Sequence, residues 1–275
     1  MQPEPAVPID PRRILAMGGG GFTMPEEDRS EALDRFVLEL TATAVPRICF
    51  LPTASGDPRE QVTRFYERFG DWPCEPSTLS LFHLGRDRID PVAHILAQDA
   101  LYVGGGSMRN MLAIWREHGI DEAMRTAWHR GVVLAGLSAG AMCWFEGGVS
   151  MSGGRPEVVR GIGLLPGSLS VHLDGEPERL QLYEETVGSG ELASGLAADD
   201  CAAAVYRGTE LAECVVSRAG ARVVTVAPDG CGGAVRRALP VRVLPGAAAP
   251  GGDALTASHG VSELRALRAG RQRWE

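Results

Sequence analysis

The residues most able to perform chemistry in this sequence surround one serine. Residues 136–140 read GLSAG, and the apolar residues 132–135 lead directly into them. Where a strand turns sharply into a helix at a G-x-S-x-G pattern, the serine hydroxyl is exposed, and the next amide, here that of Ala139, lies beside it as an oxyanion donor. The pattern is short, so it is compatible both with a nucleophile at Ser138 and with close packing at the start of a helix.

A serine nucleophile needs a base, because its hydroxyl holds its proton too tightly at neutral pH. Among the six histidines, His172 lies at the end of an apolar run, SLSVH, that polar loop residues follow at once. His83 also ends a predicted strand, whereas the other four fall on predicted helices or near the C-terminus. A single histidine at a strand end is more often structural than catalytic, so both roles stay open for His172 on the pattern alone.

The base in turn needs an acid that fixes its tautomer and orients its ring. The candidates are Glu146, Glu157, Asp174 and the pair Asp199–Asp200. Asp174 follows His172 too closely to face its ring easily. Asp199 and Asp200 precede the strand-like run CAAAVY, which would place them at the edge of a sheet, and a solvated turn is the alternative interpretation.

Strands that end in glycine loops must position these side chains. Apolar runs predict strands, and the segments between them have helical spacing. The strands are expected at 13–19, 46–55, 76–84, 100–106 and 132–140. The helices are expected at 27–44, 57–70, 90–98, 107–119 and 120–131. This alternation predicts an α/β fold with a largely parallel sheet and helices on both faces. Glycine-rich loops at 18–21, 104–107 and 136–140 fall at strand ends, where sites form in such sheets.

The second half of the sequence has a different pattern. After a predicted helix at 176–190, short β-like runs follow at 201–208, 213–220, 221–230 and 239–246. We expect them to form antiparallel hairpins that extend the edge of the sheet. The length of 275 residues suits a single domain spanning 1–275, with 1–12 and about 246–275 less regular.

Composition narrows the class of protein. With 44% hydrophobic and 23% charged residues the chain is typical of a soluble globular protein, and its net charge of -8 argues against binding to nucleic acid or to an anionic membrane. No apolar stretch reaches the ~20 residues of a membrane span, and the N-terminal residues show no signal-peptide core. None of the six cysteines forms a CxxC pair or lies at a metal-ligand spacing to a histidine, so we expect no metal, no other cofactor and a reducing, cytoplasmic location.

Two longer segments carry a resemblance to a known family. Residues 100–145, which include GLSAGAMCWF, and residues 161–179, which include LLPGSLSVHLDGEPER, resemble the peptidase E, or aspartyl dipeptidase, family, to which cyanophycinases are related. The likeness runs from the first predicted strand to about residue 230. It implies a flavodoxin-like fold related to the class I glutamine amidotransferases, with serine in place of their cysteine, and a Ser-His-acid triad in that chain order.

The resemblance also implies which residues form the triad. Ser138 matches the family nucleophile, and His172 matches the family histidine. Asp200, in GLAADDCAAAV, is the best match to the acid. The family also offers an acid position soon after the nucleophile, but residues 148–154 of this chain carry no Asp or Glu, which favours Asp200.

Further residues are implied for binding. The oxyanion hole would consist of the Ala139 amide and an amide of the GGGS loop, from Gly105 or Gly106. Cleavage after an N-terminal aspartate requires a cation for its carboxylate, and Arg179 and Arg109 are the candidates. For Arg179, an exposed position on the predicted helix with an ion pair to Glu176 or Glu178 is an equally good interpretation.

The resulting hypothesis is a serine peptidase that hydrolyses small peptides, with Asp-X dipeptides as the implied substrates. Alternatives are a cyanophycinase-like or carboxypeptidase-like hydrolase of the same fold, and a non-catalytic, amidotransferase-like binding module. A nucleotide site at the first glycine loop is disfavoured, because GGGGF lacks both a G-x-G-x-x-G fingerprint and a GK[ST] ending. The sequence leaves homo-oligomer formation open and points to no partner beyond the peptide substrate.

Overall fold

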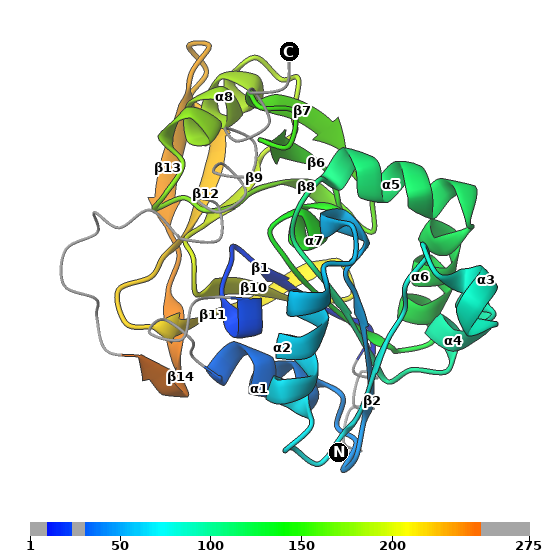
Figure 1. Cartoon of the computed structure of the whole chain (residues 1–275). Coiled ribbons are helices and arrows are strands. Elements are labelled where there is room, and N and C mark those ends of the chain that lie inside the picture. The colour runs from blue at the N-terminus through cyan, green and yellow to red at the C-terminus, as the bar shows by residue number, and fades with distance from the viewer. Residues whose placement is uncertain (1–9, 24–30, 249–275) are drawn as a thin grey trace, which may run out of the picture.

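The computed structural model describes residues 10–23 and 31–248, which form two β-sheets with helices packed against them (Figure 1). The α-helices are α1 (Ala32–Leu40), α2 (Arg59–Phe69), α3 (Leu84–Asp87), α4 (Pro91–Leu96), α5 (Met108–Glu117), α6 (Ile120–His129), α7 (Ala139–Met142) and α8 (Pro177–Gly188). Short 3-10 helices lie at Gly21–Thr23 (η1) and Thr53–Ser55 (η3). Within these described ranges, no helix has the length and apolar character needed to span a lipid bilayer.

The larger sheet has eight strands in the order β14-β11-β10-β1-β5-β4-β2-β3. Their bounds are β1 (Arg13–Met17), β2 (Arg47–Leu51), β3 (Glu75–Thr78), β4 (Ala100–Val103), β5 (Val133–Leu137), β10 (Ala202–Arg207), β11 (Glu210–Arg218) and β14 (Val241–Ala248). The strands from β3 to β1 are all parallel, and β10 and β11 add an antiparallel hairpin beside β1. The predicted α/β fold class, with its largely parallel sheet and added C-terminal strands, is therefore confirmed.

The parallel strands β1, β2, β4 and β5 contribute side chains to two hydrophobic cores, one on either face of the sheet. In β1, Ile14 and Ala16 belong to one core, whereas Leu15 and Met17 belong to the other, and all four are fully buried. Helices α1 and α2 cover the second face, and α5 and α6 cover the first (Figure 1). Burial on both faces explains why these strands are continuous apolar runs rather than alternating ones.

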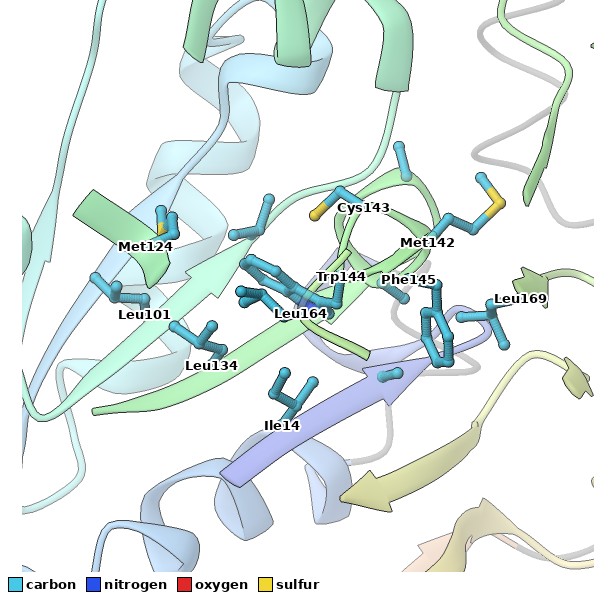
Figure 2. Close-up of a cluster of buried hydrophobic side chains, with 14 of the residues drawn as sticks. Ile14, Leu101, Met124, Leu134, Met142, Cys143, Trp144, Phe145, Leu164 and Leu169 are labelled. Atoms are coloured by element: carbon cyan, nitrogen blue, oxygen red, sulfur yellow. The ribbon is translucent and has the colours of Figure 1, made fainter. Parts of the chain in front are cut away.

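The chain just after the GLSAG motif is anchored in the first of these cores. Figure 2 shows Met142, Trp144 and Phe145 lying among side chains of the larger sheet, including Ile14 and Leu134. All five are at most 1% exposed. A helix of one turn has little stability of its own, and burying large apolar side chains contributes roughly 1.5–3 kcal/mol each. Helix α7 is therefore held by the burial of the residues that follow it.

The second sheet corrects one expectation. Its six strands, in the order β13-β12-β9-β8-β6-β7, are β6 (Phe145–Ser150), β7 (Glu157–Arg160), β8 (Leu165–Ser170), β9 (Gly195–Ala198), β12 (Val223–Pro228) and β13 (Ala234–Ala238). The predicted strand at 221–230 does not extend the larger sheet, because β12 pairs with β9 and β13 instead. Apolar alternation marks which face of a strand is buried, but it does not specify the partner strand.

The ends of the described chain also differ from expectation. Strand β14 continues to Ala248, so the region predicted to be less regular from about 246 begins inside a strand. The rest of that region, 249–275, lies outside the described residues, as do residues 1–9. In the interior, the strand predicted at 76–84 is shorter, because β3 ends at Thr78.

Candidate active site

Ser138 lies in a sharp turn between β5 and α7. Its backbone, with φ 54° and ψ -117°, is of a kind that costs a non-glycine residue about 1–3 kcal/mol and clusters at functional sites. The flanking glycines permit this turn, since a Cβ on Gly136 would overlap the Gly140 backbone and a Cβ on Gly140 would overlap the Val103 carbonyl. The Ser138 amide donates to the Met17 carbonyl at 3.1 Å, so strand β1 also holds the turn.

His172 approaches the serine from the second sheet. It is the second residue after β8, and its φ of 55° turns the chain away from the direction of that strand. The His172 Nε2 atom lies 3.0 Å from the Ser138 Oγ atom, which is within reach for proton transfer. The His172 side chain is 12% exposed, so little of the ring contacts solvent.

Asp200 completes the arrangement from the neighbouring strand. It is the second residue after β9, which pairs in parallel with β8, so His172 and Asp200 follow the carboxyl ends of adjacent strands. The His172 Nδ1 atom lies 2.6 Å from the Asp200 Oδ1 atom. The structure thus brings together Ser138, His172 and Asp200 in the order of a Ser-His-acid triad.

The Asp200 carboxyl group is stabilised in its charged form. Burial alone would raise its pKa, but the charge and hydrogen bond of His172, together with the charges of Arg218 and Arg179, outweigh burial and hold the pKa below its ordinary value. A carboxylate that stays ionised keeps Nδ1 of His172 as the donor and leaves Nε2 to accept the serine proton.

An ion pair behind the triad ties the His172 loop to the Asp200 loop. The Asp200 amide donates to Asp174 Oδ1 at 3.0 Å, and Arg218 Nη2 lies 2.6 Å from Asp174 Oδ2. The same Arg218 nitrogen donates to the Asp200 carbonyl at 3.2 Å. Asp174, which is unsuited to be the acid itself, therefore holds the backbone of Asp200, the predicted acid. Arg218 has no signal in the sequence, because it meets Asp174 only through the fold.

The first glycine loop packs directly against the triad. A Cβ on Gly19 would overlap Asp200 Oδ1 and would lie 3.0 Å from His172 Cε1. The Cys201 amide donates to the Gly19 carbonyl at 3.0 Å. The glycine is therefore required here for close approach of the backbone to two side chains, a role that the sequence pattern did not reveal.

Two of the three residues predicted to form an oxyanion hole, Ala139 and Gly105, lie next to Ser138. Ala139 follows the serine at the start of α7, and a Cβ on Gly105 would lie 3.2 Å from the Ser138 Cβ. Within the described part of the chain, the amides of Gly105, Gly106 and Ala139 donate to no protein acceptor. If Ser138 acts as a nucleophile, such unpaired donors beside it are suited to stabilise a developing oxyanion.

The two arginines predicted for substrate binding are both held by carboxylates. Arg179 is 5% exposed, its Nη2 lies 2.9 Å from Glu176 Oε2, and its Nη1 donates to the Val171 carbonyl at 3.2 Å. Arg109 is exposed and lies 2.7 Å from Glu157. Substrate binding by either arginine stays a prediction.

The alternative acids are engaged elsewhere. Glu146 lies on β6, is exposed, and accepts the Gly167 amide at 3.2 Å. Glu157 lies on β7 and binds Arg109 through both carboxylate oxygens. Asp199 faces Arg222, with 3.0 Å between Oδ2 and Nε, so Asp200 is the acid that contacts the histidine.

Comparisons with known proteins bear on the family and the fold of the chain. Residues 14–214 match the model of peptidase family S51. The chain is 45% identical over 215 residues to the Bacillus subtilis (strain 168) protein named "Uncharacterized peptidase YgaJ", covering 78% of this chain and 92% of that protein. It also resembles the crystal structure of a peptidase from an acI-B1 Actinobacterium, with a TM-score of 0.64 at 16% identity over 84% of this chain and 94% of the other. At that identity, the structural likeness supports the fold alone.

Proposed function

Because the chain belongs to peptidase family S51, the peptidase E family that its motifs predicted, we propose that it hydrolyses short peptides as a serine-type enzyme. Ser138 is the nucleophile, His172 is the general base and then the general acid, and Asp200 orients His172. The observation that carries this proposal is the continuous line of contacts, 3.0 Å from Ser138 Oγ to His172 Nε2 and 2.6 Å from His172 Nδ1 to Asp200 Oδ1.

The first half of the reaction forms an ester with the enzyme. Ser138 Oγ attacks the carbonyl carbon of the scissile bond while His172 Nε2 takes the hydroxyl proton. Negative charge then develops on the carbonyl oxygen, and the amides of Ala139 and the GGGS loop stabilise it. Each such donor is worth roughly 3–4 kcal/mol in the transition state. The intermediate collapses as the C–N bond breaks, and the leaving amine takes the proton from His172 Nε2.

The second half regenerates the enzyme. A water molecule gives a proton to His172 Nε2 and attacks the ester carbonyl, and the returning proton releases Ser138 as the peptide acid departs. Through both halves Asp200 accepts a hydrogen bond from His172 Nδ1, which fixes the ring and stabilises its charged form. The low pKa of Asp200 supports this role, because the carboxylate stays ionised while the imidazole cycles.

Asp-X cleavage is the finer proposal that comes from the family resemblance. It requires a cation close to the substrate carboxylate, and the candidates are Arg179 and Arg109. Each arginine is paired with a glutamate. The general proposal of short-peptide hydrolysis rests on the contacts among Ser138, His172 and Asp200, so it does not depend on an aspartate preference. Asp-X dipeptides, β-Asp-Arg peptides and C-terminally blocked peptides, assayed side by side, separate a dipeptidase from cyanophycinase-like and carboxypeptidase-like enzymes.

Labelling with a fluorophosphonate tests the nucleophile. We expect the wild type to be labelled at Ser138, as read by intact mass and peptide mapping. Ser138→Ala should abolish the label and lower kcat for short peptides on the order of 10⁶-fold. The matched control is Ser189→Ala, an exposed serine at the end of α8, which should leave labelling and hydrolysis unchanged. Labelling that persists in Ser138→Ala contradicts the assignment, and a wild type that neither labels nor hydrolyses any peptide favours the binding-module alternative.

A further inference from the structure

A cavity of about 410 Å³ lies at the same edge of the larger sheet as the candidate active site. It is lined by Thr53, Ala54, Ser55, Gly56, Phe82, Asn110, Ala113 and Ile114. These residues come from η3, from the loop after β3 and from α5, so segments that follow three parallel strands meet there. The volume lies within the roughly 300–1,000 Å³ that is usual for small-molecule sites.

The topology of the sheet accounts for the position of this cavity. Strands β2 and β4 are neighbours, but the chain leaves β2 through α2 toward β3 at the outer edge, and it leaves β4 through α5 and α6 toward β5 on the inner side. Helices α2 and α5 also pack on opposite faces (Figure 1). Diverging connections leave a crevice beyond the carboxyl ends of the two strands, and ligands of open α/β sheets bind in such crevices.

The cavity adjoins the GGGS loop beside the serine. A Cβ on Gly106 would overlap the Ala54 carbonyl, and the Ser107 amide donates to that same carbonyl at 2.7 Å. One residue earlier in the loop, Gly105 packs against Ser138. A peptide whose scissile carbonyl points at this loop therefore has a neighbouring side chain within reach of the cavity.

The lining of the cavity is uncharged and largely apolar. None of the described residues that line it is ionisable at neutral pH, and Ala54, Ala113, Ile114 and Phe82 supply apolar surface. Phe82 is 52% exposed, whereas every other phenylalanine of the chain is at most 8% exposed. An exposed aromatic ring at the edge of an apolar cavity gains free energy when apolar groups cover it.

We propose that this cavity is a substrate subsite for an apolar side chain close to the scissile bond, so that the enzyme favours short peptides with Leu or Phe at one fixed position. The inference rests on the proposed function and names its substrate class. A charged side chain is disfavoured in this subsite, because no ionisable residue lines it to offset the loss of hydration.

Hydrolysis of dipeptide and tripeptide panels by the full-length chain tests this subsite. One position at a time varies among Gly, Leu, Phe, Asp and Arg, and the products are quantified by mass spectrometry. At one position we expect kcat/KM for Leu or Phe to exceed that for Gly by about tenfold or more. Ala113→Trp, which places an indole in the cavity from an exposed position on α5, should lower this ratio by about fivefold or more.

Two further variants complete the design. Phe82→Ser removes the exposed aromatic ring and should lower the same ratio independently of Ala113→Trp. Ala93→Trp changes an exposed alanine on α4 that does not line the cavity, and it should keep the wild-type ratio.

A profile in which no position favours Leu or Phe over Gly, Asp and Arg, or a Leu-to-Gly ratio that Ala113→Trp and Phe82→Ser both leave unchanged, would overturn the subsite. Each of these results presupposes wild-type hydrolysis that Ser138→Ala abolishes. If the wild type hydrolyses no peptide at all, the proposed function itself fails, so the two failures are distinguishable.

Discussion

Replacing Gly19 with alanine tests the proposed triad without changing any of its members. The φ of Gly19 lies outside the left-handed region, so alanine can adopt the same backbone conformation. The new methyl group would nevertheless overlap Asp200 Oδ1 and lie 3.0 Å from both Asp200 Cγ and His172 Cε1. The loop cannot easily withdraw, because its Gly19 carbonyl accepts the Cys201 amide at 3.0 Å.

The size of the effect follows from these contacts. Non-bonded heavy atoms pack best about 3.5–4.0 Å apart, so the Asp200 carboxylate must move by roughly 1.5 Å. The 2.6 Å separation between His172 Nδ1 and Asp200 Oδ1 would then exceed the usual hydrogen-bond limit of about 3.2 Å. Misplacement by about 1 Å can cost about 10²-fold, and disabling the acid of a Ser-His-Asp triad costs about 10⁴-fold. We therefore expect kcat to fall by about 10²–10⁴-fold, which is about 3–5 kcal/mol at the transition state.

The assay measures kcat and KM on the best wild-type peptide, together with the rate of fluorophosphonate labelling. The matched control is Gly175→Ala, in the loop after His172, where a Cβ meets no atom within 4 Å; its kcat should stay within about twofold of wild type. A thermal unfolding curve shows whether a loss of activity in Gly19→Ala is due to misfolding. If it is, Asp200→Asn is assayed in place of Gly19→Ala, and its kcat is expected to fall by about 10⁴-fold. A folded Gly19→Ala enzyme with wild-type kcat would refute the reasoning that Asp200 orients His172.

The remaining predictions concern two other aspartates. Asp174→Asn keeps an oxygen for the Asp200 amide but loses the charge that faces Arg218. We therefore expect kcat to fall by roughly tenfold at nearly constant KM, and we expect a larger loss of kcat in Asp174→Ala. Equal kcat in the wild type and both variants would show that this ion pair does not position Asp200. Burial raises the pKa of Asp34 from 3.8 to about 7 despite the nearby charge of Arg68. Because the folded state then holds a proton that the unfolded state has lost, the free energy of unfolding should fall as pH rises from about 4 to about 7 and then level off. The free energy of unfolding should change by up to about 4 kcal/mol over this pH range in the wild type, and Asp34→Asn should reduce that change, as measured by urea titrations. An equally steep pH dependence in the variant would show that other groups cause it.

The sequence predicted those parts of the site that local pattern encodes. The GLSAG turn places Ser138 because a strand, two glycines and a short helix are all visible within ten residues. His172 shared its position at a predicted strand end with His83, so the family resemblance, rather than the pattern, singled out His172. The choice between Asp199 and Asp200 came from the family resemblance rather than from the pattern, since both are acidic and adjacent. In the fold they diverge, because both lie in the turn between β9 and β10, where Asp199 binds Arg222 and Asp200 binds His172.

The parts that escaped prediction depend on contacts between distant segments. Strand β9 is only four residues long, GLAA, and nothing in its composition indicates that it joins a second sheet. Arg218 reaches Asp174 across 44 residues of sequence. The cavity beside the GGGS loop exists only because the connections from β2 and β4 diverge. Such features follow from strand order, which apolar periodicity does not determine.

Backbone strain is concentrated where the two sheets meet. Three of the non-glycine residues with positive φ in the described chain, Ser138, His172 and Cys201, lie in the turns that form the site, at a cost of about 1–3 kcal/mol each. Each turn is held by a different neighbour: the first by burial of Trp144 within the core, the second by two amides that donate to the His172 carbonyl at 3.0 Å, and the third by the Gly19 carbonyl. Because these restraints come from the segment after α7, from the loop after His172 and from the loop after β1, no single segment of the chain fixes the proposed triad. The geometry of the proposed triad depends on all three turns. A substitution that changes the backbone of any one of them should therefore lower kcat by a larger factor than it lowers the stability of the fold.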